Sequence, residues 1–373
     1  MTKENNDVYQ KLKNHLDTLP VGYPSTESGV ELKILKNLFT HQQAKMAMKL
    51  DFIAKPLKKI YRKVRKENIS IEELEQILDK MYSDGLINRG INEENGENIK
   101  YYANAPFAIG IYEYQLNRLN KEFIDLAEQY FEEAFIDEYN VSGIPQLRTI
   151  PIEQAVETTS AVATYDDFRQ VIEDCGGPIA VADCICKKEK DLLGEPCKQT
   201  DLREICFSFR NAAKLYEEKG LGRFISKEEA LEILEQAQKD GLVLQPGNSQ
   251  RPMCICCCCG CCCGILRNQK NYDAPVKFFA TNYYAKVDSE LCIGCGVCET
   301  RCNMDAVTIK DEISNINLDR CIGCGVCVPT CPEEAISLIQ KEEEIIPPKN
   351  TVATYQAIMH GKAKKARTEK SEN

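Results

Sequence analysis

The sequence predicts an α+β protein of several domains, and three observations support this prediction. The chain has 373 residues, more than one domain usually contains. Residues 1–140 contain none of its 21 cysteines, which sets the first third of the chain apart from the rest. In that third, helical periodicity is followed by two turn-linked extended segments. The expected parts are an N-terminal arm (1–25), a helical domain with a strand pair (26–140), a cysteine-rich middle domain (141–275), a third domain (276–345) and a basic tail (346–373).

The N-terminal domain is predicted to contain three helices and a strand pair. Residues 31–39 are amphipathic, and residues 57–66 form a basic helix. Ser70 and Glu73 have the spacing of a capping box, which opens a third helix. A polar turn over 92–96 then separates two extended segments. This order resembles a winged helix-turn-helix domain.

A winged helix can bind DNA, but the charges here argue against it. The predicted recognition helix is acidic, with Glu72, Glu73, Glu75 and Asp79, and DNA phosphates would repel it. The preceding helix is basic, but in a winged helix that element crosses the backbone without reading bases. The net charge of −10 also disfavours general affinity for nucleic acid. We therefore expect a protein-docking role, with a redox-sensing DNA-binding regulator as an alternative.

The C-terminal part contains two copies of one cysteine spacing, C-x2-C-x2-C-x3-C. Three thiolates spaced in this way wrap one face of a cubane, and a remote thiolate completes it. Residues 287–340 resemble two-cluster bacterial ferredoxins, in which the fourth cysteine of each run binds the other cluster. The resemblance implies two [4Fe–4S] clusters, one held by Cys292, Cys295, Cys298 and Cys331 and the other by Cys302, Cys321, Cys324 and Cys327.

Other features of this segment agree with the resemblance, with one departure. Side-chain polarity alternates over residues 306–309 and 313–318, as in the strands of a hairpin, and residues 335–339 are expected to form another extended segment. Asn303 follows Cys302, whereas the second run has the family's proline; we expect this change to loosen or re-tune the ligand. Glycines next to the ligands let the backbone approach the clusters, at Gly294, Gly296, Gly323 and Gly325. Zinc or a disulfide framework is the alternative for isolated C-x2-C pairs, but zinc motifs do not use this doubled run.

The middle domain offers a second set of thiols, Cys184, Cys186, Cys197 and Cys206. Four thiolates suit an Fe–S cluster or a zinc ion. We assign them to a third cluster, because another cluster would extend an electron relay; zinc and ordinary buried cysteines are the alternatives. Cys175 lies outside this spacing and is expected to be a buried thiol.

Residues 254–263 contain eight cysteines in ten positions. Thiols at this density would oxidise or scavenge metal unless coordinated, so we expect a metal-binding loop. Its Cys-Cys-Gly pairs resemble the motif of heterodisulfide reductases and, more closely, a C-x-C-C-G-x-C-C-G loop in larger Fe–S proteins of anaerobes. The resemblance implies a fourth cluster on Cys256, Cys258, Cys259, Cys262 and Cys263. Cys254, Cys257 and Cys261 are extra thiols in this alignment.

The segments between the cysteine blocks are predicted to support them. Residues 207–219 and a helix capped by Ser226 have helical periodicity, and residues 242–244 form a short strand. Residues 152–159 are expected to be extended and residues 165–174 helical. The tail is expected to be partly disordered, with no more than a short helix over 351–360.

Together these patterns predict an iron–sulfur electron-transfer protein of an anaerobe, working with a redox partner protein. A polar N-terminus and many cysteines favour the reducing cytoplasm, and no apolar run approaches the roughly 20 residues of a membrane helix. No dinucleotide fingerprint, P-loop or nucleophile–base pattern is present, so an electron carrier or oxidoreductase subunit is favoured over a stand-alone enzyme. The alternative activity is an Fe–S oxidoreductase acting on a thiol or disulfide at residues 254–263.

Overall fold

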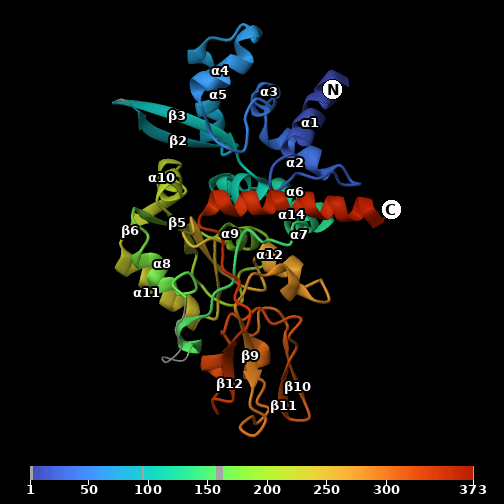
Figure 1. Ribbon diagram of the computed structural model, residues 1–373, viewed down its shortest axis with the longest axis vertical. Coiled ribbons are helices and arrows are strands. Elements are labelled where there is room, and N and C mark those ends of the chain that lie inside the picture. Colours follow the sequence, from blue (N-terminus) through green and yellow to red (C-terminus); the bar gives the residue numbers. More distant parts are fainter. Residues whose placement is uncertain (1–2, 95, 157–162, 373) are drawn as a thin grey trace. The chain divides into compact units, whose positions relative to one another are not determined.

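The computed structural model describes residues 3–94, 96–156 and 163–372 (Figure 1). The chain divides into two compact units, residues 1–138 and 139–373, and both mix helices with strands as predicted. Within the described ranges, no helix combines the length and the apolar character needed to cross a bilayer.

The first unit packs helices against a small antiparallel sheet. The sheet contains β1 (Lys55–Pro56), β2 (Ile87–Glu94) and β3 (Glu97–Asn104) in the order β1-β3-β2. The expected helices are present, together with further ones: α1 (Lys3–Leu16), α2 (Val30–Leu38), α3 (His41–Ala47), α4 (Leu57–Val64), α5 (Ile71–Ser83), α6 (Lys121–Tyr130) and, at the boundary, α7 (Ile136–Asn140). Strand β2 continues to Glu94 through the predicted turn, and Asn95 lies outside the described residues.

Helix α5 is tied to the strand pair by charge. Ser70 caps its first turn and accepts a hydrogen bond from the Glu73 N–H, as the capping box predicts. Asp79 accepts hydrogen bonds from Arg89 Nη1 at 2.9 Å and from Tyr102 Oη at 2.8 Å. One acidic residue of the helix is therefore already neutralised within this unit.

The second unit is built on a five-stranded antiparallel sheet in the order β6-β4-β5-β8-β7. Its strands are β4 (Ile179–Asp183), β5 (Glu204–Phe209), β6 (Gly222–Ile225), β7 (Val243–Pro246) and β8 (Cys254–Cys258). The helices of this region are α8 (Phe168–Glu173), α9 (Ile185–Leu192), α10 (Asn211–Glu218), α11 (Lys227–Lys239) and α12 (Gly264–Gln269).

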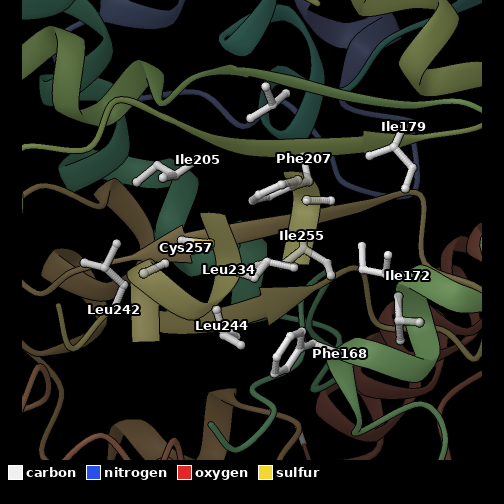
Figure 2. Packing of buried hydrophobic residues seen from close by; sticks show 14 of the residues in the cluster. Phe168, Ile172, Ile179, Ile205, Phe207, Leu234, Leu242, Leu244, Ile255 and Cys257 are labelled. Carbon is white, nitrogen blue, oxygen red and sulfur yellow. The ribbon is translucent and has the colours of Figure 1, made fainter. Parts of the chain in front are cut away.

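The core of this region lies on one face of the sheet (Figure 2). Phe207 of β5 and Ile255 of β8 pack there with Phe168 of α8 and Leu234 of α11. Because side chains alternate along a strand, Cys257 joins this core while its strand neighbours project to the opposite face.

Three local predictions need correction. Residues 207–209 belong to β5, and helix α10 starts only at Asn211. Half of the expected cysteine loop is strand β8, because its backbone pairs with both β5 and β7. In the expected extended segment, Glu153–Ala155 forms a 3₁₀ turn, and residues 157–159 lie outside the described ranges. The helix capped by Ser226 is confirmed as α11.

The C-terminal segment consists of two short antiparallel strand pairs. Strands β10 (Val307–Lys310) and β11 (Ile313–Ile316) form the predicted hairpin. Strand β12 (Ile336–Gln340) pairs with β9 (Tyr283–Val287), which precedes the first cysteine run. A short helix, α13 (Val297–Arg301), lies within the first run and contains Cys298, and a 3₁₀ turn (Val328–Thr330) lies between the third and fourth cysteines of the second run.

The tail is more ordered than the sequence suggested. It forms one helix, α14 (Thr351–Glu372), and the expected limit near residue 360 is wrong. Packing contributes to this order: Ile358 is buried, Thr354 Oγ1 donates a hydrogen bond to the Asn248 carbonyl at 2.6 Å, and a β-carbon on Gly361 would lie 2.5 Å from the Ser142 carbonyl oxygen. These contacts anchor the first half of the helix.

Candidate iron–sulfur site

Four cysteines assigned to one cluster line a single cavity, which we call the outer cavity: Cys292, Cys295, Cys298 and Cys331. Backbone N–H groups point at two of these sulfurs, from Ser314 to Cys292 at 3.3 Å and from Ala335 to Cys331 at 3.2 Å. The Ser314 hydroxyl also lies 3.3 Å from the Cys298 sulfur. Such hydrogen bonds stabilise thiolates and tune an iron–sulfur cluster.

The other four cysteines line a second cavity, which we call the inner cavity: Cys302, Cys321, Cys324 and Cys327. The N–H of Ala285 donates to Cys321 at 3.4 Å and that of Ala306 to Cys302 at 3.2 Å, repeating the pattern of the outer cavity. Burial raises the pKa of Cys324 to about 12. A thiolate in this cavity therefore needs a cation beside it, which fits iron.

The glycines of both runs have left-handed backbone conformations and close neighbours. A β-carbon on Gly294 would lie 2.3 Å from the Glu312 carbonyl oxygen, and one on Gly323 would lie 2.1 Å from that of Tyr283. The positive φ angles, 63° and 64°, independently favour glycine. Glycine is required here because the cysteine loops pack directly against the β10–β11 turn at Gly294 and against strand β9 at Gly323.

Six further cysteines form what we call the six-thiol group: Cys184, Cys186, Cys206, Cys256, Cys258 and Cys263. Cys206 and Cys256 face each other across β5 and β8. Hydrogen bonds from the Cys206 and Cys258 thiols hold the pKa of Cys256 well below its usual value. Hydrogen bonds from Cys186 and Cys258 do the same for Cys263. The six side chains form one connected network of sulfur atoms, and cysteine sulfur binds zinc and Fe–S clusters.

Four other cysteines form what we call the four-thiol group: Cys197, Cys259, Cys261 and Cys262. Their sulfur atoms all lie within 4.8 Å of one another. Lys187 is buried beside them and donates a hydrogen bond to the Cys259 sulfur at 3.0 Å. Burial alone would lower the pKa of Lys187, but the negative charges of Cys184 and Cys259 raise it.

The middle cysteines are therefore grouped differently from the sequence assignment. Cys197 joins the four-thiol group, whereas its expected partners Cys184, Cys186 and Cys206 lie with Cys256. Cys261, an extra thiol in the sequence alignment, lies among the four. The register of β5 against β8 brings Cys206 beside Cys256, and spacing along the chain gives no measure of that register. Cys175 is buried, as expected.

Asn303, the departure from the ferredoxin pattern, connects the C-terminal segment to the cysteine run. Its Nδ2 donates to the Gly241 carbonyl at 2.8 Å, and its Oδ1 accepts from the Gly260 N–H at 2.8 Å. A β-carbon on Gly260 would lie 2.3 Å from the Asn303 carbonyl oxygen. Proline, which the ferredoxin pattern has at this position, carries no side-chain amide and could not make these two bonds. Asn303 therefore acts as a docking residue between the C-terminal segment and the cysteine run.

A family model described as a 4Fe-4S dicluster domain matches residues 285–340. The matched segment contains all eight cysteines of the outer and inner cavities. No curated protein and no solved structure matches the chain. The C-terminal segment is therefore similar to 4Fe-4S dicluster domains, and it supports a role for this chain in iron–sulfur electron transfer.

Proposed function

We propose that this protein is an iron–sulfur electron carrier with [4Fe–4S] clusters in the outer and inner cavities and a third Fe–S cluster on the six-thiol group. When bound, these clusters would supply one-electron transfer. The crossed ligand sets proposed for the two cavities agree with their lining residues, which include four cysteines each. The protein's part is to hold the thiolates, exclude water and order the centres.

The inner cavity is proposed to lie between the outer cavity and the six-thiol group in the relay, and one observation supports this order. A single apolar cluster contains Cys302 and Cys324 of the inner cavity together with Cys256, Cys258 and Cys263 of the six-thiol group. Met304 and Ile322 fill the space around them and are 1% and 2% exposed. The inner cavity and three cysteines of the six-thiol group therefore border the same apolar cluster. This arrangement supports a relay between them within the second unit.

The outer cavity is the side at which a redox partner would approach. Cys295 is exposed, and the apolar side chains around it are unusually open: Leu291 is 51% exposed, Ile293 61% and Val297 41%. Exposed apolar residues beside a redox centre favour docking of a partner protein. We propose that the partner contacts this rim, so that the outer cavity is the entry or exit point of the relay.

The thiol/disulfide oxidoreductase alternative receives less support from burial. Six of the eight cysteines in residues 254–263 are buried, and Cys256 and Cys261 are only partly exposed. A substrate disulfide must reach a sulfur atom to exchange with it. The arrangement therefore favours a carrier over an enzyme that acts on thiols at this segment.

The proposal is tested by counting iron and acid-labile sulfide in the anaerobically purified full chain. Three cubanes would give about twelve irons per chain. A triple variant, Cys184→Ala/Cys206→Ala/Cys256→Ala, leaves three thiols in the six-thiol group, fewer than a cubane needs, and should lower the count to about eight.

The matched control is Cys175→Ala/Cys257→Ala, which removes two buried thiols from the apolar core and should keep about twelve irons. A wild-type count of about eight would refute the third centre and leave the ferredoxin-like pair. A count near zero after anaerobic purification would refute the proposed function altogether.

A further inference from the structure

The four-thiol group differs from the two ferredoxin-like quartets in how closely its sulfur atoms approach. The sulfur of Cys261 lies 3.5 Å from that of Cys259, 3.6 Å from that of Cys262 and 3.8 Å from that of Cys197. Cys197 and Cys259 are separated by 3.7 Å. Neither ferredoxin-like quartet is drawn together this closely in the part of the chain that the structure describes.

These separations match the geometry of a single tetrahedral ion. Zinc binds thiolate sulfur at about 2.3 Å, and four such bonds in a tetrahedron place the sulfurs about 3.8 Å apart. A cubane binds each thiolate through a different iron, so its four sulfurs must stand farther apart. The two cavities of the C-terminal segment meet that requirement, since open space lies between their cysteines.

We propose that Cys197, Cys259, Cys261 and Cys262 hold one zinc ion in a structural site, separate from the Fe–S clusters. All four ligands come from the protein, and a closed set of four thiolates is typical of structural zinc. Zinc neither gains nor loses electrons, so the site takes no part in the relay.

Lys187 supplies charge compensation for the site. Four thiolates around Zn²⁺ carry a net charge of about −2, which is costly to bury without a cation. Lys187 is 1% exposed, and its ammonium group donates to the Cys259 sulfur at 3.0 Å. A hydrogen-bond donor to a ligating sulfur also orients that ligand. A buried lysine at this position is explained by the anionic site beside it.

The zinc ion would fasten two segments that have little regular structure. Cys197 lies in the connection between α9 and β5, and the other three ligands follow β8. Gly260, within that second segment, donates its N–H to Asn303. The site therefore holds in place the surface on which the ferredoxin-like segment docks. It does so whether or not the six-thiol group carries a cluster.

The decisive experiment measures zinc and iron separately in the full chain, purified anaerobically. We expect about one zinc per chain in the wild type, and near zero in Cys261→Ala, with the iron content unchanged. Cys257→Ala is the control: it comes from the same cysteine run, but its side chain lies in the apolar core (Figure 2) and should keep the zinc.

A second variant covers the case in which Cys261→Ala does not fold. Lys187→Gln keeps all four ligands and should lower zinc affinity about 10–100-fold, measured by competition with a chromogenic chelator. Cobalt substitution gives an independent readout: tetrahedral thiolate bands should appear in the wild type and Cys257→Ala but not in Cys261→Ala.

Three outcomes would overturn the proposal. Absence of zinc from the wild type would do so, as would retention of zinc by Cys261→Ala. Loss of iron in place of zinc in Cys261→Ala would assign the group to iron. The proposed electron carrier function is judged by the iron count of the other cysteine sets, so the two proposals fail in distinguishable ways.

Discussion

The two cysteine runs share the seven residues Cys-Ile-Gly-Cys-Gly-Val-Cys but have opposite surroundings. Ile293 of the first run is 61% exposed, whereas Ile322, at the same position of the second run, is 2% exposed. The valines differ in the same way, with Val297 at 41% and Val326 at 1%. The repeat specifies how a cubane is ligated, and neighbouring elements decide how deeply each cavity is buried.

The burial of the second run has an identifiable cause within the second unit. Val326 packs with Ile152 and Ala155, and the Ile152 N–H donates to the Cys324 carbonyl at 3.1 Å. Ile322 packs in the apolar cluster that also contains cysteines of the six-thiol group. One copy of the repeat is thus an interior element of the protein, while the other forms a surface. The difference suits a carrier with one exposed and one internal centre.

The largest expected difference between the runs is in stability. Ile322→Ala should lower the free energy of unfolding by about 2–5 kcal/mol, because it leaves a cavity in a packed interior. Ile293→Ala should change it by less than about 0.5 kcal/mol, because the side chain is mostly in solvent. Anaerobic denaturant titration, followed by circular dichroism and iron release, measures both. Equal losses in the two variants would contradict the contrast in burial.

A smaller difference is expected at the residue that follows each run. Asn303→Ala should cost about 1–3 kcal/mol, because it leaves the buried Gly241 carbonyl and Gly260 N–H without their partner. Pro332 is exposed, so Pro332→Ala should be nearly neutral. Limited proteolysis and the same denaturant titration check this pair. A neutral Asn303→Ala would show that the asparagine does not dock the two segments.

The smallest expected effect is on reduction potential. Ser314 and Ala285 occupy equivalent positions, since their N–H groups bond Cys292 and Cys321 respectively. The Ser314 hydroxyl lies near Cys298, and Ser314→Ala should lower the potential of the outer cluster. A hydrogen bond of about 1 kcal/mol corresponds to roughly 40 mV for one electron. Potentiometric titration monitored by EPR measures the shift.

The reciprocal change, Ala285→Ser, adds a hydroxyl beside the inner cavity and should raise the potential of that cluster by a similar amount. The two variants should therefore shift different centres in opposite directions. A shift of the same centre in both variants would contradict the assignment of Ser314 to the outer cavity and Ala285 to the inner one.

Much of the C-terminal segment was predictable from local pattern. The hairpin over residues 307–316 follows from alternation of apolar residues. In the first unit and the middle region, the capping residues Ser70 and Ser226 gave the starts of α5 and α11. These features depend on residues close together in the chain. Helix α14 was underestimated because buried contacts, such as that of Ile358, stabilise it and have no local signature.

The middle cysteines show where local pattern is insufficient. Residues 254–263 look like one metal-binding loop, but strand alternation divides them between two faces of a sheet. Cys206 meets Cys256 only because β5 pairs with β8 in that register. A shift of one residue would exchange the faces and separate the thiols. Spacing alone could not assign these ligands.

The sequence by itself determined the doubled cysteine run, its glycines and therefore a segment suited to two cubanes, because three ligands on one short loop are fixed by local geometry. Only the tertiary structure decided that Ile293 is exposed and Ile322 buried. It also decided that Cys197 lies with Cys261 and apart from Cys206. The reason is that burial and ligand grouping depend on contacts between distant parts of the chain, which strand register and packing set.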